Sequence, residues 1–279
     1  MNKYSLTQIL VTLFVLVGTA QSNSVQSNQK IKTNAVLVIG THSSAPEKDI
    51  IEMDKIGDLL TNRGVRVRKF YIQDANWEDI KRAAKNAHFF VYKGHGSNQG
   101  KNGTGGLVIN DFISNDQIEN ELELKHNAMV LFQSVCGAAG SSASDRGDIG
   151  IKEAEQRVSD YAEPFINNGA SVYYANNYHE GCLEFLNYFF SGHTIEQSYL
   201  KSLTSRINIE VTENYIYNPK YTVSITSSPP YGTVTKIHTK WINGEKVTIK
   251  EKVQDSKGYD TAFVGKSNFK FLNLKNLTL

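Results

Sequence analysis

The chain has 279 residues, with 30 Lys and Arg against 28 Asp and Glu and a formal net charge of +2 at pH 7. This near balance disfavours a nucleic acid or an anionic membrane as the partner. Only two cysteines are present, which excludes a disulfide-rich scaffold, while the length is enough for one sizeable α/β core with an accessory segment.

The N-terminus has the features of a secretory signal peptide. Lys3 provides a positive charge, residues 9–17 are apolar, and residues 18–20 are small, as at a signal cleavage site. The apolar run is shorter than the roughly 20 residues that span a bilayer. We therefore expect a signal peptide over 1–20, a polar linker over 21–33, and an exported protein, secreted or periplasmic, with no membrane attachment after the signal is removed.

The first half of the mature chain alternates between strand-like and helix-like segments. Apolar runs that end in glycine or polar residues predict strands, and apolar residues at helical spacing predict helices. Asn76 is in position to cap the second helix. The expected elements are a strand at 34–40, a helix at 47–62, a strand at 65–71, a helix at 77–87 and a strand that leads to His95.

The alternation continues after a loop rich in glycine and asparagine at 98–106. Ser114 and Gln117 have the spacing of a capping box and predict a helix to about residue 124. The expected elements are a short strand at 106–110, this helix, a strand that leads to Cys136, a loop at 137–150, a helix at 151–167, a strand at 169–175 and helices within 180–205.

Strands that are nearly all apolar and alternate with helices indicate a mainly parallel sheet covered by helices on both faces. The composition changes after residue 205. Residues 206–279 consist of β-prone runs separated by turn signals, of which Asn243-Gly244 is a strong hairpin signal. We therefore predict an α/β domain over 34–205, followed by a small β-rich C-terminal extension that packs on it.

Two strand ends carry side chains with chemical potential. One apolar run leads to Gly94-His95-Gly96, and a second leads to Cys136-Gly137. In a parallel sheet, ligands bind beyond the carboxyl ends of the strands, so both residues are expected at one edge. An imidazole beside a thiol favours the reactive thiolate, and the backbone amides of Gly96 and Cys136 are candidates for an oxyanion hole. The pattern predicts a cysteine hydrolase.

These motifs resemble the caspase-like cysteine peptidase clan, which includes caspases, gingipains, clostripain, legumain and CHAT-domain proteins. The segment from Tyr92 to Ser97 is similar to the gingipain and CHAT form, and segments 165–172 and 185–192 resemble later CHAT elements. The resemblance covers about residues 34–205. It implies a three-layer sandwich and a thiol protease, an endopeptidase acting on peptides or proteins, with Cys136 as nucleophile and His95 as general base and acid.

The chain also departs from this clan. Clostripain and legumain relatives carry an acidic residue near the end of the cysteine strand, where this chain has Gln133, Ser134 and Val135. A preference for basic residues is therefore not transferred from them. Asp145 and Asp148 in the following loop are candidates to line the substrate-binding pocket, and the alternative is that they are ordinary solvated loop acids.

Two other functions remain open at this stage. One is a caspase-like module that binds peptides without cleaving them, and the other is a secreted structural domain with a Cys136–Cys182 disulfide. The seven histidines show no metal-ligand spacing, and no recognisable calcium loop is present. We therefore expect neither a metal nor a cofactor.

Overall fold

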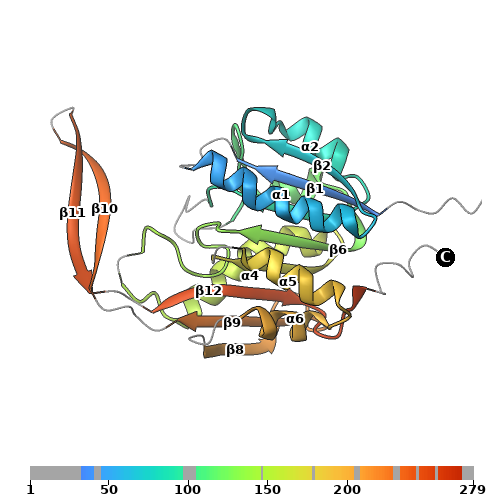
Figure 1. Cartoon of the computed structure of the whole chain (residues 1–279). Helices are drawn as coiled ribbons and strands as arrows, with labels where there is room; N and C mark the ends of the chain where they lie inside the picture. Colours follow the sequence, from blue (N-terminus) through green and yellow to red (C-terminus); the bar gives the residue numbers. More distant parts are fainter. Residues whose placement is uncertain are drawn as a thin grey trace, which may run out of the picture. The chain divides into compact units, whose positions relative to one another are not determined.

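The computed structural model describes residues 33–40, 45–96, 105–145, 147–177, 180–203, 208–228, 233–242, 245–254 and 257–271. The expected signal peptide at 1–20 and most of the linker lie outside these ranges. An eight-stranded sheet, in the order β2-β1-β3-β6-β7-β12-β9-β8, forms the centre of the fold (Figure 1).

Five strands make the parallel part of this sheet, and neighbouring strands in it run in the same direction. β1, β3 and β7 are buried along almost their whole length, which explains their continuous apolar sequences. The prediction of a mainly parallel sheet is confirmed. The strands are β1 (Asn34–Ile39), β2 (Arg66–Tyr71), β3 (Ala87–Lys93), β6 (Leu124–Gln133) and β7 (Ala170–Asn176).

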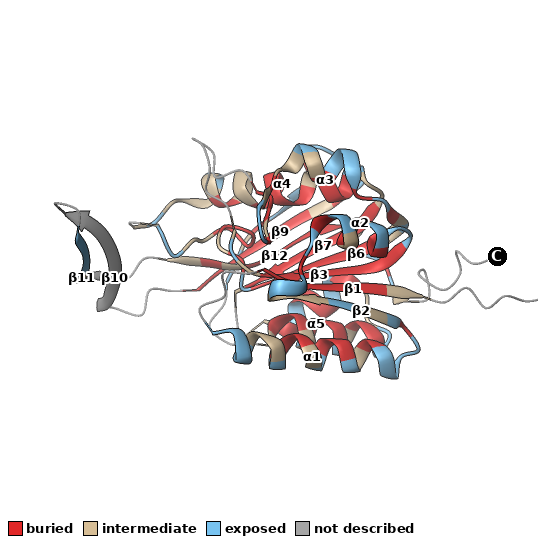
Figure 2. Cartoon of the chain, turned by 90° about the horizontal axis from the view of Figure 1, so that it is seen from above, coloured by how far each residue is buried: buried red, intermediate tan, exposed pale blue. Residues whose placement is uncertain are grey.

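The helices form one layer on each face of the sheet, so the described part of the chain is a mixed α/β fold in three layers (Figure 2). Each layer buries the apolar side of its helices in a separate core cluster. One layer consists of α2 (Trp77–Ala84), α3 (Asn115–Glu121) and α4 (Ile151–Asn167). The other consists of α1 (Pro46–Asn62), α5 (Gly181–Phe190) and α6 (Ile195–Ser202).

Two predicted helix starts have the expected caps. The side chain of Asn76 accepts a hydrogen bond from the amide of Asp79 at 3.2 Å, which satisfies one of the free amides at the start of α2. At α3 the Ser114 hydroxyl accepts from the Gln117 amide, and the Gln117 side chain accepts from the Ser114 amide. The capping box at the start of α3 is confirmed.

The β-rich segment after residue 205 completes the central sheet. β12 (Gly258–Gly265) pairs antiparallel with β7 and with β9 (Thr222–Ser228), and β8 (Asn208–Asn214) forms the edge beyond β9. This part of the chain therefore continues the same sheet instead of packing on it as a separate layer. It was not predictable from the sequence that β12 would lie next to β7.

Two further sheets have two strands each and are not hydrogen-bonded into the central sheet. β10 (Thr233–Ile242) and β11 (Glu245–Gln254) pair with Ile242 opposite Glu245, which is the hairpin expected from the sequence, and the turn residues Asn243 and Gly244 lie outside the described residues. β4 (Leu107–Val108) and β5 (Phe112–Ile113) form the other pair.

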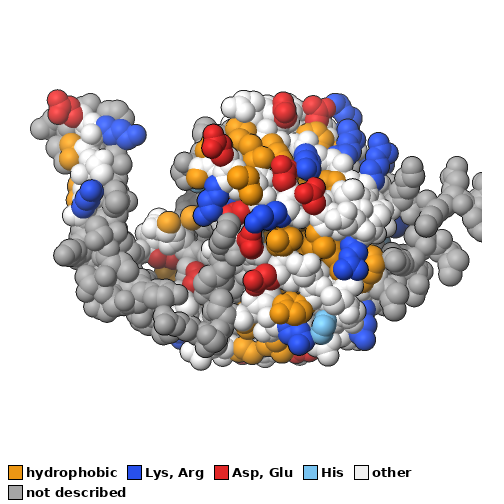
Figure 3. Space-filling view, viewed as in Figure 1, with side chains coloured by type: hydrophobic (Ala, Val, Ile, Leu, Met, Phe, Trp, Pro, Cys, Tyr) orange, Lys and Arg blue, Asp and Glu red, His pale blue; other side chains and the backbone are white. Residues whose placement is uncertain are grey.

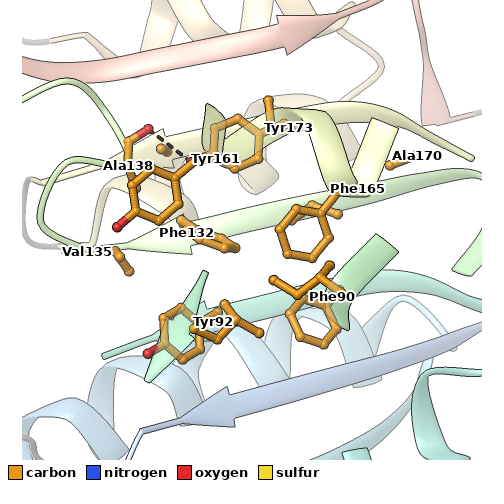
Figure 4. Packing of buried hydrophobic residues seen from close by; sticks show 14 of the residues in the cluster. Phe90, Tyr92, Phe132, Val135, Ala138, Tyr161, Phe165, Ala170 and Tyr173 are labelled. Atoms are coloured by element: carbon orange, nitrogen blue, oxygen red, sulfur yellow. Dashed lines mark hydrogen bonds between the residues drawn. The ribbon is translucent and has the colours of Figure 1, made fainter. Parts of the chain in front are cut away.

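The core beneath the carboxyl ends of β3, β6 and β7 is aromatic (Figure 4). The ring of Phe132 on β6 lies 5.3 Å from the ring centres of both Tyr92 and Tyr173 and 5.5 Å from that of Phe165. Tilted and edge-on aromatic pairs of this kind add about 0.5–1.5 kcal/mol each to the burial of their area. The strand ends thus rest on a rigid, well-packed base.

The surface carries charges of both signs. On the face shown in Figure 3, basic and acidic side chains alternate with apolar ones, in line with the balanced composition. None of the described helices combines the length and apolarity that crossing a bilayer requires.

Candidate active site

His95 and Cys136 follow neighbouring parallel strands that end at the same level. Lys93, the last residue of β3, is in register with Gln133, the last residue of β6. His95 comes two residues after Lys93 and is exposed, and Cys136 comes three residues after Gln133 and is half-buried. Both are therefore at the carboxyl edge of the sheet, where the parallel arrangement predicts them.

The two loops touch through the backbone at Gly96. A β-carbon added to Gly96 would lie 3.0 Å from the carbonyl carbon of Cys136 and closer still to its oxygen and to the Tyr161 hydroxyl. The glycine thus lets the chain just after His95 pack directly on the backbone of Cys136. This contact places the backbone just after His95 against the backbone of Cys136.

Three buried tyrosines fix the backbone of both loops from below. Tyr92 on β3 donates a hydrogen bond to the His95 carbonyl at 2.9 Å, and Tyr161 on α4 donates to the Cys136 carbonyl at 3.0 Å. Tyr173 on β7 donates to the Ala138 carbonyl at 2.9 Å, the bond drawn in Figure 4. Burial raises the pKa of Tyr92 and Tyr173 above the ordinary value, so their hydroxyls stay protonated and remain donors.

Two backbone amides at this edge of the sheet, those of Gly96 and Cys136, have no hydrogen-bond partner among the described residues. The amide of Gly137 donates to Ser141 and that of Ala138 donates to Val135, which closes the turn. Neither the Gly96 nor the Cys136 amide is bonded to another residue in the described part of the chain. The two amides predicted to form an oxyanion hole are thus not used by the fold around them.

β12 and α4 hold the rest of this loop. Ser141 and Tyr259 exchange two hydrogen bonds: the Ser141 amide donates to the Tyr259 carbonyl at 2.8 Å, and the Tyr259 amide donates to the Ser141 hydroxyl at 2.6 Å. Arg157 on α4 donates to the Gly140 carbonyl at 3.1 Å. A loop that looks unconstrained in sequence is therefore fixed on two sides.

The two acids proposed to line the substrate pocket have structural contacts. Asp145 forms an ion pair with Arg157 at 2.9 Å and accepts a hydrogen bond from the Ser142 amide. Asp148 accepts from the Gly150 amide at 2.9 Å and from the Tyr259 hydroxyl at 3.4 Å. Neither is among the described residues that line the pocket beside Cys136.

This pocket has a volume of about 340 Å³, at the lower end of the range of sites that bind organic groups. It lies between the ends of β6 and β7 and the start of β12. Small and polar side chains dominate its lining, which consists of Ser134, Cys136, Ser141, Ser142, Ala143, Asn177 and Asp260.

Asp260 reaches the pocket because β12 runs antiparallel to its neighbour. Thr261 is in register with Asn176, the last residue of β7, so the first residues of β12 lie at the carboxyl edge of the parallel strands. The Asp260 carboxylate accepts hydrogen bonds from the Ser228 hydroxyl at 2.9 Å and from the side-chain Nδ2 of Asn177 at 3.3 Å. Asp260 was not predicted from the sequence, since nothing in the segment 258–265 indicates that it pairs with β7.

Cys182 lies apart from this site. It is fully buried at the start of α5, in the core cluster on the α1 side of the sheet, and its Sγ points to the Phe132 carbonyl at 3.6 Å. Both cysteines are free thiols in the structure. Burial raises the pKa of the Cys182 thiol well above its ordinary value. The geometry does not favour the alternative of a Cys136–Cys182 disulfide.

A buried ion pair lies directly below the His95 loop. The Lys93 ammonium contacts the Glu52 carboxylate on α1 at 2.7 Å and that of Asp49 at 3.2 Å, and the side chains of Lys93 and Glu52 are 6% and 4% exposed. The pair ties the end of β3 to α1. The sequence reasoning did not single out Lys93, although a lysine next to an apolar strand end is a visible signal.

The described residues contain no cluster of three or more His, Cys, Asp or Glu side chains arranged to hold a metal ion. Comparison with known proteins does not assign this site. No family model matches the chain, and no curated protein matches it. Among solved structures, one that is similar in part is a crystal structure of CapF with the inhibitor 3-isopropenyl-tropolone, at 13% identity over 85% of this chain and 93% of that chain. Its TM-score of 0.21 is too low to establish a shared fold.

Proposed function

We propose that this protein is an exported cysteine endopeptidase of the caspase-like type, with Cys136 as nucleophile and His95 as general base and acid. The observation that carries the proposal is the backbone contact between Gly96 and Cys136, at the ends of two adjacent parallel strands. A thiol and an imidazole presented from touching loops are the two groups that thiol-dependent acyl transfer needs.

The reaction follows from the roles of these groups. His95 takes the proton of the Cys136 thiol, and the sulfur attacks the carbonyl carbon of the substrate's peptide bond. The amides of Gly96 and Cys136 stabilise the negative oxygen of the tetrahedral intermediate. His95 then donates the proton to the leaving amine, which leaves a thioester on Cys136. Water activated by His95 hydrolyses the thioester, which releases the acid and restores the thiol.

The fixed backbone supports this chemistry. Tyr92 and Tyr161 hold the carbonyl groups of His95 and Cys136, so the two loops keep their relative position without a contribution from substrate. Preorganisation of this kind removes the reorganisation cost from the chemical step, and a displacement of about 1 Å costs about 100-fold in rate. The export of the protein is proposed from residues 1–20, which resemble a signal peptide.

The test is the reactivity of the mature protein toward iodoacetamide near pH 6, read by peptide mass spectrometry. We expect Cys136 to react much faster than an ordinary thiol, and the His95→Ala variant to lose most of this rate. Cleavage of a denatured protein substrate, abolished by Cys136→Ser, distinguishes a peptidase from a peptide-binding module. Slow labelling of Cys136 that is unchanged by His95→Ala would overturn the proposal.

A further inference from the structure

The pocket beside Cys136 carries an uncompensated negative charge. Asp260 is the carboxylate among its described lining residues, and the groups that donate to it, Ser228 and Asn177, are neutral. A carboxylate has room for about four hydrogen bonds, so two neutral donors leave acceptor positions unfilled.

The basic residues nearby are engaged with other acids. Lys257 pairs with Glu210 at 2.5 Å, and Arg157 pairs with Asp145 and Glu153 at 2.9 Å. Within the described ranges, no lysine or arginine forms an ion pair with Asp260. Among the described residues, Glu210, Asp145 and Glu153 thus have basic partners, whereas Asp260 inside the pocket has only neutral donors.

The position of Asp260 is fixed by the strands on both sides. Its carboxylate accepts a hydrogen bond from the Ser228 hydroxyl on β9, and its backbone carbonyl accepts one from the backbone amide of Asn177 at 2.8 Å. A β-carbon added to Gly258 would lie 2.9 Å from the Ser228 hydroxyl and closer to the Asp260 carboxylate, so the carboxylate packs against a glycine. An acid held in one place is a better partner for a charged group than a mobile one, because less side-chain entropy is lost on binding.

We propose that this pocket binds a cationic side chain, lysine or arginine, of the residue whose carbonyl Cys136 attacks, and that Asp260 determines this specificity. The inference rests on the proposed peptidase function. An acidic side chain would place two like charges in the pocket, and an apolar one would remove water from Asp260 without replacing its hydrogen bonds. A lysine or arginine satisfies the carboxylate and the polar rim formed by Ser134, Ser141 and Ser142.

The experiment uses peptidyl acyloxymethyl ketones that differ only in the side chain next to the ketone: lysine, arginine, norleucine or glutamate. Each reagent alkylates a catalytic thiol, and intact-mass spectrometry gives the second-order rate of Cys136 labelling. We expect the lysine and arginine reagents to react at least about tenfold faster than the norleucine reagent, and the glutamate reagent to be the slowest, in keeping with a charge-assisted hydrogen bond.

Asp260→Asn is the main variant, since it removes the charge and keeps an oxygen and nitrogen of similar shape. We expect the lysine-to-norleucine rate ratio to fall about tenfold. The ratio is measured within each variant, so a change in the folded fraction cancels. Ala143→Lys provides a second variant that leaves the hydrogen bonds of Asp260 intact, because Ala143 is an exposed residue of the pocket rim, and its added cation should lower the same ratio. Asp116→Asn is the matched control, because Asp116 is an exposed acid on α3 that is not among the described lining residues, and it should leave the ratio unchanged.

The experiment distinguishes a wrong role for Asp260 from a wrong proposal of peptidase function. A norleucine reagent that labels Cys136 as fast as the lysine reagent, in a reaction that needs His95, would overturn the role of Asp260 and leave the peptidase intact. A ratio unchanged by Asp260→Asn would do the same. If no ketone labels Cys136 and iodoacetamide reacts equally with and without His95, the peptidase proposal falls and the specificity falls with it.

Discussion

Gly96→Ala tests the contact on which the candidate site depends. The added methyl would lie 3.0 Å from the carbonyl carbon of Cys136 and closer to its oxygen, and both atoms belong to a backbone held by Tyr161. The neighbouring chain must shift by an amount on the order of 1 Å, which costs about 100-fold in a reaction that needs aligned groups. Overpacking of this kind costs about 1–3 kcal/mol of stability.

The assay is the rate of Cys136 alkylation near pH 6, together with urea unfolding. We expect the labelling rate to fall toward that of His95→Ala while the protein remains folded. Gly192→Ala is the control. Its φ of +93° should cost about 1–2 kcal/mol of stability, and its methyl meets no atom within 4 Å, so the labelling rate should not change. A Gly96→Ala protein that labels within about threefold of wild type would refute the packing argument.

Three further predictions concern other parts of the molecule. Lys93→Met leaves the Glu52 carboxylate buried without its 2.7 Å partner and should cost about 3–5 kcal/mol in urea unfolding, most of which the double variant with Glu52→Gln should recover. If the free-energy losses of Lys93→Met and Glu52→Gln simply add in the double variant, the prediction that the two side chains act as a buried ion pair is wrong. Burial and Lys125 lower the pKa of His88, so the unfolded chain binds the extra proton first. Stability should therefore fall as the pH drops below about 6.5, and less so in His88→Phe, measured by unfolding at pH 7.5 and 5. Cys182 is fully buried and its thiol pKa is raised, so it should resist iodoacetamide at neutral pH until urea unfolds the protein. Labelling of Cys182 before the protein unfolds would show that the start of α5 opens away from β6.

Most elements of the fold were predictable because local patterns determine them. The start of α3 follows from the Ser114–Gln117 capping box, and the helix expected at 151–167 is α4 with those bounds. The parallel sheet followed from strands that are apolar on both faces. These are properties of a short stretch of chain, so no knowledge of distant partners was needed.

The placement of β12 was not predictable for the opposite reason. Its partners are β7 and β9, and the β10–β11 hairpin separates it from β9 along the chain. No turn signal states that a strand returns past a hairpin to insert beside β7. The candidate acids were therefore sought in the loop after Cys136, where Asp145 and Asp148 lie, and Asp260 was overlooked.

The order of strands suggests how chemistry and specificity are divided in this fold. The loops that follow the parallel strands β3 and β6 carry the expected reacting groups, at the edge where the carboxyl ends of all five parallel strands lie. β7 ends at the same edge, and Asn177, which follows it, also lines the pocket. An antiparallel strand instead brings its first residues to the edge, and β12 thereby adds Asp260 and the Tyr259 bonds to Ser141 from a part of the chain that does not carry His95 or Cys136. If the proposed specificity is right, substitution at Asp260 is expected to change which side chain the pocket accepts while the contact between Gly96 and Cys136 is preserved.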